Sequence, residues 1–156
     1  MAGPDQNRAR YPFTSFNFAV ELSLPDKPQL CSAAFAECDG LEVTMDVKTI
    51  REGGSNDRQI RMAGALSYGQ LSLKRGMTET TDLWDWFEAV RANPRLRAQG
   101  EVVLLGSNGS DERARFILSR CLPVKLKAPA LNAKDGTVAI EELQVAYESL
   151  SLKPRS

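Results

Sequence analysis

The chain has 156 residues, 42% hydrophobic and 26% charged, a composition that is typical of one folded domain and excludes a disordered or collagen-like chain. Lysine and arginine total 20, as do aspartate and glutamate, so the formal net charge is zero and no overall field favours nucleic acid or an anionic membrane. The absence of histidine excludes Ser-His-Asp triads, Cys-His dyads and imidazole metal ligands, and we predict no catalytic, metal-binding or cofactor-binding residues.

Residues 1–12 are polar and lack the apolar stretch of a signal peptide, so we predict a flexible lead and no secretion signal. The three cysteines, Cys31, Cys38 and Cys121, include no CxxC pair, which indicates a reducing compartment with neither a disulfide framework nor a zinc site. No apolar run reaches the roughly 18 residues of a membrane span. We therefore expect a cytoplasmic protein that does not bind membranes itself.

The first strands are predicted by alternation of apolar and polar residues. This pattern runs from Phe16 to Leu24 and ends at Pro25. A short strand through Phe35 leads to Asp39-Gly40, a pair that favours a hairpin, so we expect the chain to double back there. The alternation from Leu41 to Val47 then predicts a long strand with one face in the core.

A loop from Glu52 to Asp57 separates this strand from a returning strand through Ile60 and Met62. The two strands would form a long hairpin arm that the chain has too few residues to cover. Because isolated two-stranded ribbons are marginally stable in water, we predict that the arm packs on another subunit.

A further strand up to Gly76 precedes a predicted helix, which Thr80 or Thr81 would cap and Asn93-Pro94 would end. Apolar residues recur there at i, i+3, i+4 and i+7, the pattern of a core-facing stripe formed by Leu83, Trp86, Phe87 and Val90. Trp84 lies off this stripe. It is a candidate subunit contact, because tryptophan is enriched at the centres of interfaces.

In the second half, Val102 to Leu105 and Arg113 to Leu118 are predicted to pair as a hairpin. An irregular crossing through Pro123, Pro129 and Leu131-Asn132-Ala133 would lead to a final strand from Thr137 to Leu152. A change of apolar parity within that strand predicts a β-bulge at Glu141-Glu142.

These elements predict a mainly β, α+β fold within residues 13–153, a single domain. We expect a small antiparallel β-barrel or sandwich with one flanking helix and a long β-hairpin arm.

Three groups of residues could carry chemistry, but each has a simpler explanation. Gly53-Gly54 lacks the lysine and the helix of a phosphate loop and indicates a turn. Glu141-Glu142 cannot flank one glycosidic bond, because neighbours on a strand point to opposite faces. Lys74-Arg75 with Lys125 and Lys127 lack interleaved aromatic residues that would stack bases, and indicate a solvated face or a subunit interface.

Seven short motifs follow one another along the chain: Phe16-x-Phe18-x-Val20-Glu21, Phe35-Ala36-Glu37-Cys38-Asp39-Gly40-Leu41-Glu42, Glu52-Gly53-Gly54-x-Asn56, Leu73-Lys74-Arg75-Gly76, Leu83-Trp84-Asp85-Trp86, Pro123-Val124-Lys125 and Leu131-Asn132-Ala133. In this order and spacing they resemble the tail tube proteins of contractile phages and of phage-derived extracellular contractile injection systems. The resemblance extends from Phe13 to Leu152. Cys38 is a departure, since the family usually carries a small or β-branched residue there.

The resemblance implies a structural protein without enzymatic activity or cofactor, whose hexameric rings stack into a hollow tube inside a contractile sheath. It also implies a baseplate hub and spike as partners, a lumen for a protein or DNA payload, and assembly in the bacterial cytoplasm. The arm would contact the adjacent ring, and we assign this role to Arg51, Glu52, Gly53, Gly54, Ser55, Asn56, Asp57, Arg58 and Arg61.

Three alternatives remain open at this point. The chain could form a type VI-like secretion tube ring, which often exists as free hexamers, or a baseplate-proximal tube initiator. It could also be a stand-alone ligand-binding barrel, which would be monomeric and would need an apolar cavity.

Overall fold

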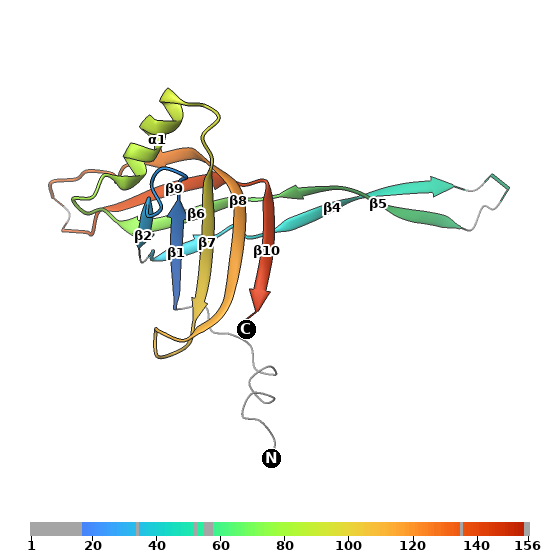
Figure 1. The fold of residues 1–156 in the computed structure, drawn as a ribbon, viewed down its shortest axis with the longest axis horizontal. Helices are drawn as coiled ribbons and strands as arrows, with labels where there is room; N and C mark the ends of the chain where they lie inside the picture. The colour runs from blue at the N-terminus through green and yellow to red at the C-terminus, as the bar shows by residue number, and fades with distance from the viewer. Residues whose placement is uncertain (1–16, 34, 52, 55–57, 135, 155–156) are drawn as a thin grey trace, which may run out of the picture.

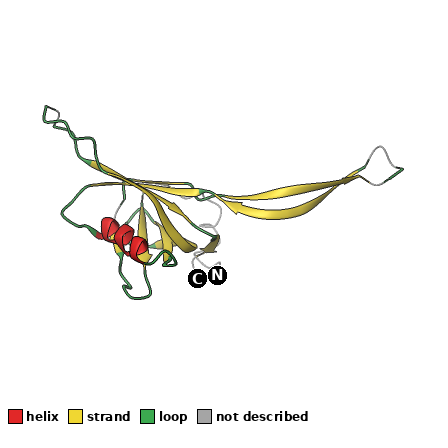
Figure 2. Cartoon of the chain, turned by 90° about the horizontal axis from the view of Figure 1, so that it is seen from above, coloured by secondary structure: helices red, strands yellow, loops and turns green. Residues whose placement is uncertain are grey.

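The computed structural model describes residues 17–33, 35–51, 53–54, 58–134 and 136–154. These residues form ten strands, all paired antiparallel, and one helix (Figures 1 and 2). The elements are β1 (Phe18–Ser23), β2 (Cys31–Ala33), β3 (Glu37–Asp39), β4 (Val43–Arg51), β5 (Gln59–Tyr68), β6 (Gln70–Gly76), α1 (Asp82–Ala92), β7 (Ala98–Leu105), β8 (Glu112–Lys127), β9 (Ile140–Ala146) and β10 (Ser149–Pro154). The prediction of a mainly β fold with one helix is confirmed, whereas the predicted lead at residues 1–12 lies outside the described residues.

The main sheet has the strand order β2-β1-β7-β8-β9-β6-β3, and β10 also pairs with β8. The long strand β8 connects the two halves of this sheet, because its first part pairs with β7 and β10 and its last part pairs with β9. Among the described residues, β2 and β3 end the order without pairing with each other. The sheet therefore curves around the core without closing into a barrel.

Strand β8 contains Pro123, so the expected irregular crossing is wrong up to Lys127. Beyond Lys127 it is correct, because Pro129 and residues 131–133 belong to no strand. The backbone of β8 turns at Arg120, where φ is 53°, and its register with β9 shifts between Pro123 and Lys125. Proline is tolerated in a strand at such an irregularity, where the ladder is already interrupted. The bend lets one strand serve both halves of the sheet.

The expected hairpin at Asp39-Gly40 is also wrong, because β3 pairs with β6 and β4 pairs with β5. Gly40 has a φ of 98°, and a Cβ atom there would lie 1.9 Å from the carbonyl oxygen of Gln70. The glycine thus permits a close approach to the start of β6. The Asp-Gly signal was local, and it did not reveal which strand β3 would join.

The predicted single strand from Thr137 to Leu152 is two strands, β9 and β10, separated at Tyr147 and Glu148. No bulge occurs at Glu141-Glu142, since the register of β9 with β6 is continuous from Ile140 to Ala146. Glu141 is 2% exposed and lies on the same buried face of β9 as Leu143 and Val145. The parity change disappears once this glutamate is counted as an inward residue.

The core lies between the two halves of the sheet and under α1. Leu22, Leu73, Leu118 and Val145 are among its most deeply buried members. From the helix, Leu83 and Trp86 are fully buried, and Phe87 and Val90 pack against the core as partly buried residues.

The helix begins after Thr81 and ends at Asn93, whose backbone N–H donates to the carbonyl of Ala89. The Thr81 hydroxyl does not cap a backbone N–H, because it bonds to the Asp85 carboxylate at 3.1 Å. The acidic first turn, with Asp82 and Asp85, is favourable at the positive end of the helix dipole.

Candidate functional site

The arm formed by β4 and β5 projects from one end of the molecule (Figures 1 and 2). Its strands form a sheet of their own, separate from the main sheet. Every residue of β4 is exposed, as are most of β5, so the expectation that one face of Leu41 to Val47 lies in the core is wrong beyond Leu41, which is partly buried against the core. The alternation correctly indicated a strand, but no described residue of the chain covers either of its faces.

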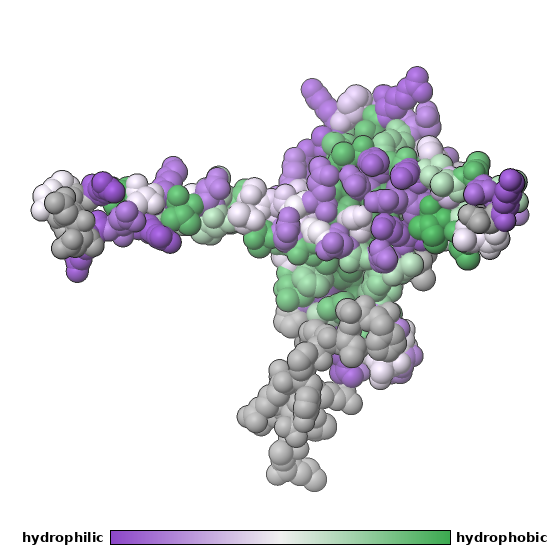
Figure 3. All heavy atoms as spheres, turned by 180° about the vertical axis from the view of Figure 1, so that it is seen from behind, coloured by the Kyte–Doolittle hydropathy of each residue, from purple (hydrophilic) through white to green (hydrophobic). Residues whose placement is uncertain are grey.

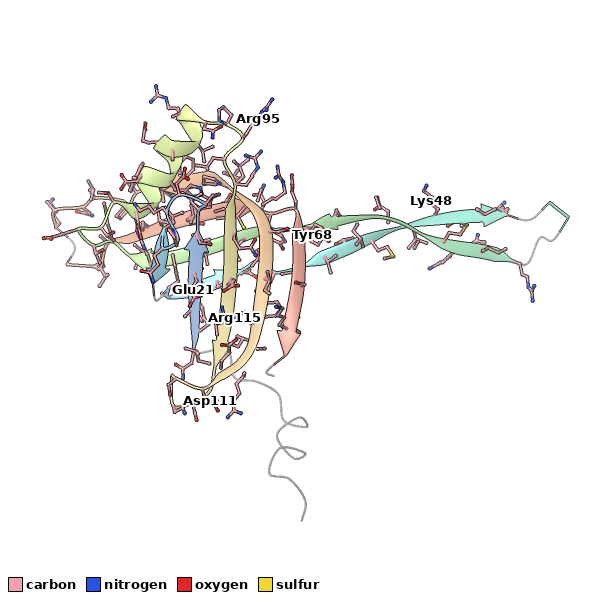
Figure 4. All side chains as sticks on the ribbon, viewed as in Figure 1. Glu21, Lys48, Tyr68, Arg95, Asp111 and Arg115 are labelled. Carbon is pink, nitrogen blue, oxygen red and sulfur yellow. The ribbon has the colours of Figure 1, made fainter. Side chains whose placement is uncertain are left out.

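The root of the arm is held firmly by Tyr147. The phenolic oxygen of this side chain accepts a hydrogen bond from the Glu42 backbone N–H at 3.1 Å and lies 2.7 Å from the carbonyl oxygen of Gly40, to which it can donate. Its ring also packs against that of Tyr68, with centroids 5.7 Å apart (Tyr68 is labelled in Figure 4). Because Tyr147 belongs to the core, these contacts attach the root of the arm to the core.

At the tip, the structure describes five of the nine predicted ring-stacking residues: Arg51, Gly53, Gly54, Arg58 and Arg61. Glu52, Ser55, Asn56 and Asp57 lie outside the described residues. Gly54 has a φ of 101°, a conformation that favours glycine. All three arginines are exposed, and none forms an ion pair with another described residue.

Trp84 is 39% exposed on the outer side of α1, next to the exposed Asp85 and near Glu88 on the following turn. A large apolar side chain in this position is unusual on a helix face that is otherwise charged. The structure thus separates Trp84 from the arm, and the two predicted contact regions lie on different parts of the molecule.

A buried ion cluster joins the helix to the sheet, so the expectation that Arg75 lies on a solvated face or a subunit interface is wrong. Arg75 on β6 is 5% exposed, and its Nε atom lies 2.5 Å from Oε1 of Glu141 on β9. Its Nη atoms donate to both carboxylate oxygens of Asp82 at the start of α1, one of them at 3.2 Å. The guanidinium also lies 5.5 Å from the centre of the Phe35 ring.

The electrostatics of this cluster favour its charged form. Burial alone would raise the pKa of Asp82, but hydrogen bonds from Arg75 and Cys31 outweigh it, and the net effect lowers this pKa. Burial likewise disfavours the charge of Arg75, yet its bonds to the two carboxylates raise the pKa of the guanidinium. A signal was present in the sequence, because Arg75 and Glu141 each continue the inward alternation of an apolar strand.

A second network, which the sequence analysis missed, lies on the outer face of β1, β7 and β8. Arg115 bonds to Glu112 at 2.8 Å and 3.0 Å, to Glu21 at 3.3 Å, and to Glu101 (Figure 4). The hydrogen bond from Arg115 lowers the pKa of Glu112. The network thus cross-links β1, β7 and β8 on the face turned away from the core.

All three cysteines are free thiols. Burial is the main cause that raises the pKa of Cys31 and Cys121 to about 12 each, and that of Cys38 to about 11. These thiols are therefore poor nucleophiles, and they carry no sign of a catalytic role.

Slow cysteine labelling is the expected result for the folded protein. At pH 8 the thiolate fraction of Cys38, the most accessible of the three, should be about 100-fold lower than that of an ordinary thiol, because its pKa lies about 11 rather than 9.0. Timed modification with a coloured disulfide reagent measures this, with guanidinium-unfolded protein as the control that reacts at all three sites. Rapid labelling of even one cysteine in the folded protein would contradict the burial described above.

Within the described residues, no group of three or more His, Cys, Asp or Glu side chains could hold a metal ion. No helix in the same part of the chain is long and apolar enough to cross a membrane. A surface hollow of about 300 Å³ has a mainly polar lining that includes Glu21, Gln29, Gln99 and Glu101. Such a lining does not favour the alternative of a barrel that binds an apolar ligand.

Comparison with known proteins points to one family. The family model described as T4-like virus tail tube protein gp19 matches residues 14–151. A chain of the anti-feeding prophage (AFP) baseplate structure, 6-fold symmetrised, is 28% identical, with a TM-score of 0.80 over 92% of this chain and 97% of that chain. No curated protein matches the sequence.

Two further structures share the fold. A chain of the sheath-tube complex of an extracellular contractile injection system, PVC, in its extended state is 20% identical, with a TM-score of 0.81 over 99% of this chain and 100% of that chain. Hcp1 from Flavobacterium johnsoniae is 16% identical, with a TM-score of 0.51 over 90% of this chain and 97% of that chain. The resemblance to Hcp1 is therefore weaker than that to the AFP and PVC chains.

Proposed function

The chain belongs to the family of the T4-like virus tail tube protein gp19, and on that premise we propose that it builds hexameric rings stacked into the inner tube of a contractile phage tail or contractile injection system. It is a tail tube protein, and the observation that carries the proposal is the family match over residues 14–151. The 6-fold symmetrised baseplate that contains its 28% identical relative supports rings of six.

The contacts of such a tube must be heterologous, closing sideways into a ring and staying open along the axis. The exposed arm supports this arrangement, since a two-stranded ribbon gains stability by packing on another subunit. Zero net charge avoids long-range repulsion between stacked copies. We assign the axial contact to the arm segment from Arg51 to Arg61, with charges of both signs that fix the register.

The partners in this proposal are the contractile sheath, the baseplate with its hub and spike, and a payload of protein or DNA in the lumen. The relatives occur in a baseplate and in a sheath-tube complex, which supports the first two. The subunit itself would have no enzymatic activity and no cofactor, and its particles would assemble in the bacterial cytoplasm. Sheath contraction would drive the rigid tube through a target envelope.

Electron microscopy of the chain coexpressed with its baseplate proteins tests the proposal. We expect hollow tubes of stacked rings that start from the baseplate. Free hexamers that never stack would favour the type VI-like secretion ring, and a single ring at the baseplate would favour the tube initiator. A monomer under all conditions would overturn the proposal.

Trp84→Ala is expected to weaken association between subunits more than it weakens the fold. Loss of a buried interface tryptophan costs about 2 kcal/mol, about 30-fold in affinity, whereas an exposed site changes the free energy of unfolding by about 0.5 kcal/mol or less. Sedimentation measures the first quantity and urea unfolding measures the second. Arg91→Ala, exposed on the same helix, is the matched control that should change neither, and equal losses in both measurements for Trp84→Ala would refute its assignment to an interface.

A further inference from the structure

The arm carries two apolar clusters on opposite faces of its ribbon. Directly opposed residues of an antiparallel pair project from the same face. Near the root, Met45 lies opposite Leu66, and Val47 lies opposite Ala63. Near the tip, Ile50 lies opposite Ile60. Because side chains alternate along β4, positions 45 and 47 share one face and position 50 belongs to the other.

The twist of the arm brings these clusters to the same side in space. In Figure 1, β5 lies above β4 at the root and below it near the tip, so the ribbon turns over along its length. The register shift between Met45 and Val47 contributes, since a bulge increases local twist. Gly64 is required there, because a Cβ atom would lie 2.7 Å from the carbonyl oxygen of Asp46.

The arm is therefore amphipathic as a whole. One side carries an apolar strip, which we define as Met45 and Leu66 near the root and Ile50 and Ile60 near the tip. The other side carries Thr44 and Ser67 near the root, then Thr49 and Arg61 near the tip. Members of the apolar strip are between 41% and 51% exposed in the single chain. Exposed apolar side chains gathered on one side of an element mark a protein contact.

A second exposed apolar surface lies at the opposite end of the molecule. We define this far-end patch as Met77, Leu131, Val138 and Ile140, of which Leu131 is 91% and Val138 is 76% exposed. A backbone hydrogen bond of 2.9 Å from Met77 to Ala139, together with the pairing of Gly76 with Ile140, holds its two segments together. Figures 1 and 2 place this end on the far side of the main sheet from the arm, and Figure 3 shows its apolar side chains.

We propose that the apolar strip of one copy packs on the far-end patch of a second copy of this chain. The inference rests on the proposed tube and adds to it the identity of two contacting surfaces. Two different apolar surfaces at opposite ends are what a repeating, heterologous contact requires. A strip that packed on a second strip would instead give a closed dimer, which cannot be extended.

The polar side of the arm accords with this arrangement. Arg61 and Arg51 lie on that side, opposite Thr49 and Gln59. They stay in water when the strip is covered, so no arginine of β4 or β5 has to be buried. Lys48 is the charged residue of these two strands on the side of Ile50 and Ile60, and its flexible stem can extend to the edge of the contact. Arg58 precedes β5 at the exposed tip.

Disulfide cross-linking between separately labelled copies tests the pairing. Subunits that carry Met45→Cys or Ile60→Cys are mixed with subunits that carry Leu131→Cys or Val138→Cys, assembled on the baseplate and oxidised mildly. A disulfide forms only when the two Cα atoms approach to within about 7 Å. We expect cross-linked dimers in at least one mixture, and none from any variant alone.

Thr49→Cys on the polar side of the arm is the matched control and should not cross-link to either far-end variant. Wild-type chains should also give no dimer, since Cys31 and Cys121 are buried and Cys38 is half-buried. Tubes that form without any cross-link between arm and far end, or dimers from Met45→Cys alone, would overturn the inference and leave the tube itself standing. Failure of the unlabelled chain to form tubes would instead overturn the proposed function.

Discussion

Arg75→Met should lower the free energy of unfolding by about 3–5 kcal/mol, the usual cost of removing one partner from a buried ion pair. The guanidinium is the shared partner of Asp82 and Glu141, whose side chains are 15% and 3% exposed. Methionine can fill much of the space, but it leaves two carboxylates without a cation. Since those carboxylates lie on α1 and β9, the variant should also loosen the helix from the sheet. Urea unfolding measures the loss.

Lys74→Met is the matched control for this prediction. Lys74 is the neighbour of Arg75 on β6, and its ion pair with Glu37 has side chains that are 41% and 67% exposed. Exposed pairs contribute about 0–1 kcal/mol, so this variant should remain close to wild type. Similar small losses for the two variants would mean that the Arg75 cluster does not hold the helix to the sheet.

The same cluster gives a pH dependence with a defined sign. The pKa of Asp82 is lower in the folded protein than its ordinary value of 3.8. Its ion pair with Arg75 therefore contributes fully to the free energy of unfolding above that pH. The contribution is lost as the pH falls below about 4. The free energy of unfolding of Arg75→Met should therefore fall less than that of the wild type as the pH is lowered. The difference in this free energy between the two proteins should be smaller at low pH than at neutral pH.

Deletion of residues 53–56 should leave the domain folded and stop the growth of tubes. The core does not use the arm tip, since the root is anchored by Tyr147 and the tip lies far from the main sheet (Figure 1). The thermal midpoint should stay near that of the wild type, while electron microscopy with the baseplate should show no stacked rings. Full-length tubes from the deletion variant would defeat the assignment of the tip to the axial contact.

A replacement of the same four residues by alternating glycine and serine keeps the length of the arm and serves as the control. If this variant forms tubes and the deletion variant does not, the axial contact requires the length of the arm and not the side chains at its tip. Loss of tubes in both would assign it to the side chains at the tip.

Local patterns predicted the elements that depend on local contacts. The alternation before Pro25 predicted both ends of β1 to within two residues. The hairpin of β7 and β8 lies where turn residues separate two apolar runs, as predicted. The stripe that includes Leu83 and Trp86 belongs to the helix that packs on the core. In each case the residues that determine the element are close in sequence.

The remaining features depend on partners distant in sequence. The pairing of β3 with β6 brings Asp39 opposite Ser72, which no neighbouring residue encodes. The inward position of Glu141 became intelligible only with Arg75 beside it, 66 residues away. The exposure of β4 could not be deduced from its alternation, because a periodic strand shows which residues share a face and not what covers them.

A cryo-EM helical reconstruction of the assembled particle tests the central claim most directly. We expect a hollow tube of stacked rings in which every arm packs against neighbouring copies, with its apolar strip covered and Arg61 exposed to water. Tubes whose arms extend freely into solvent, or particles whose tube is built from another protein, would contradict this claim.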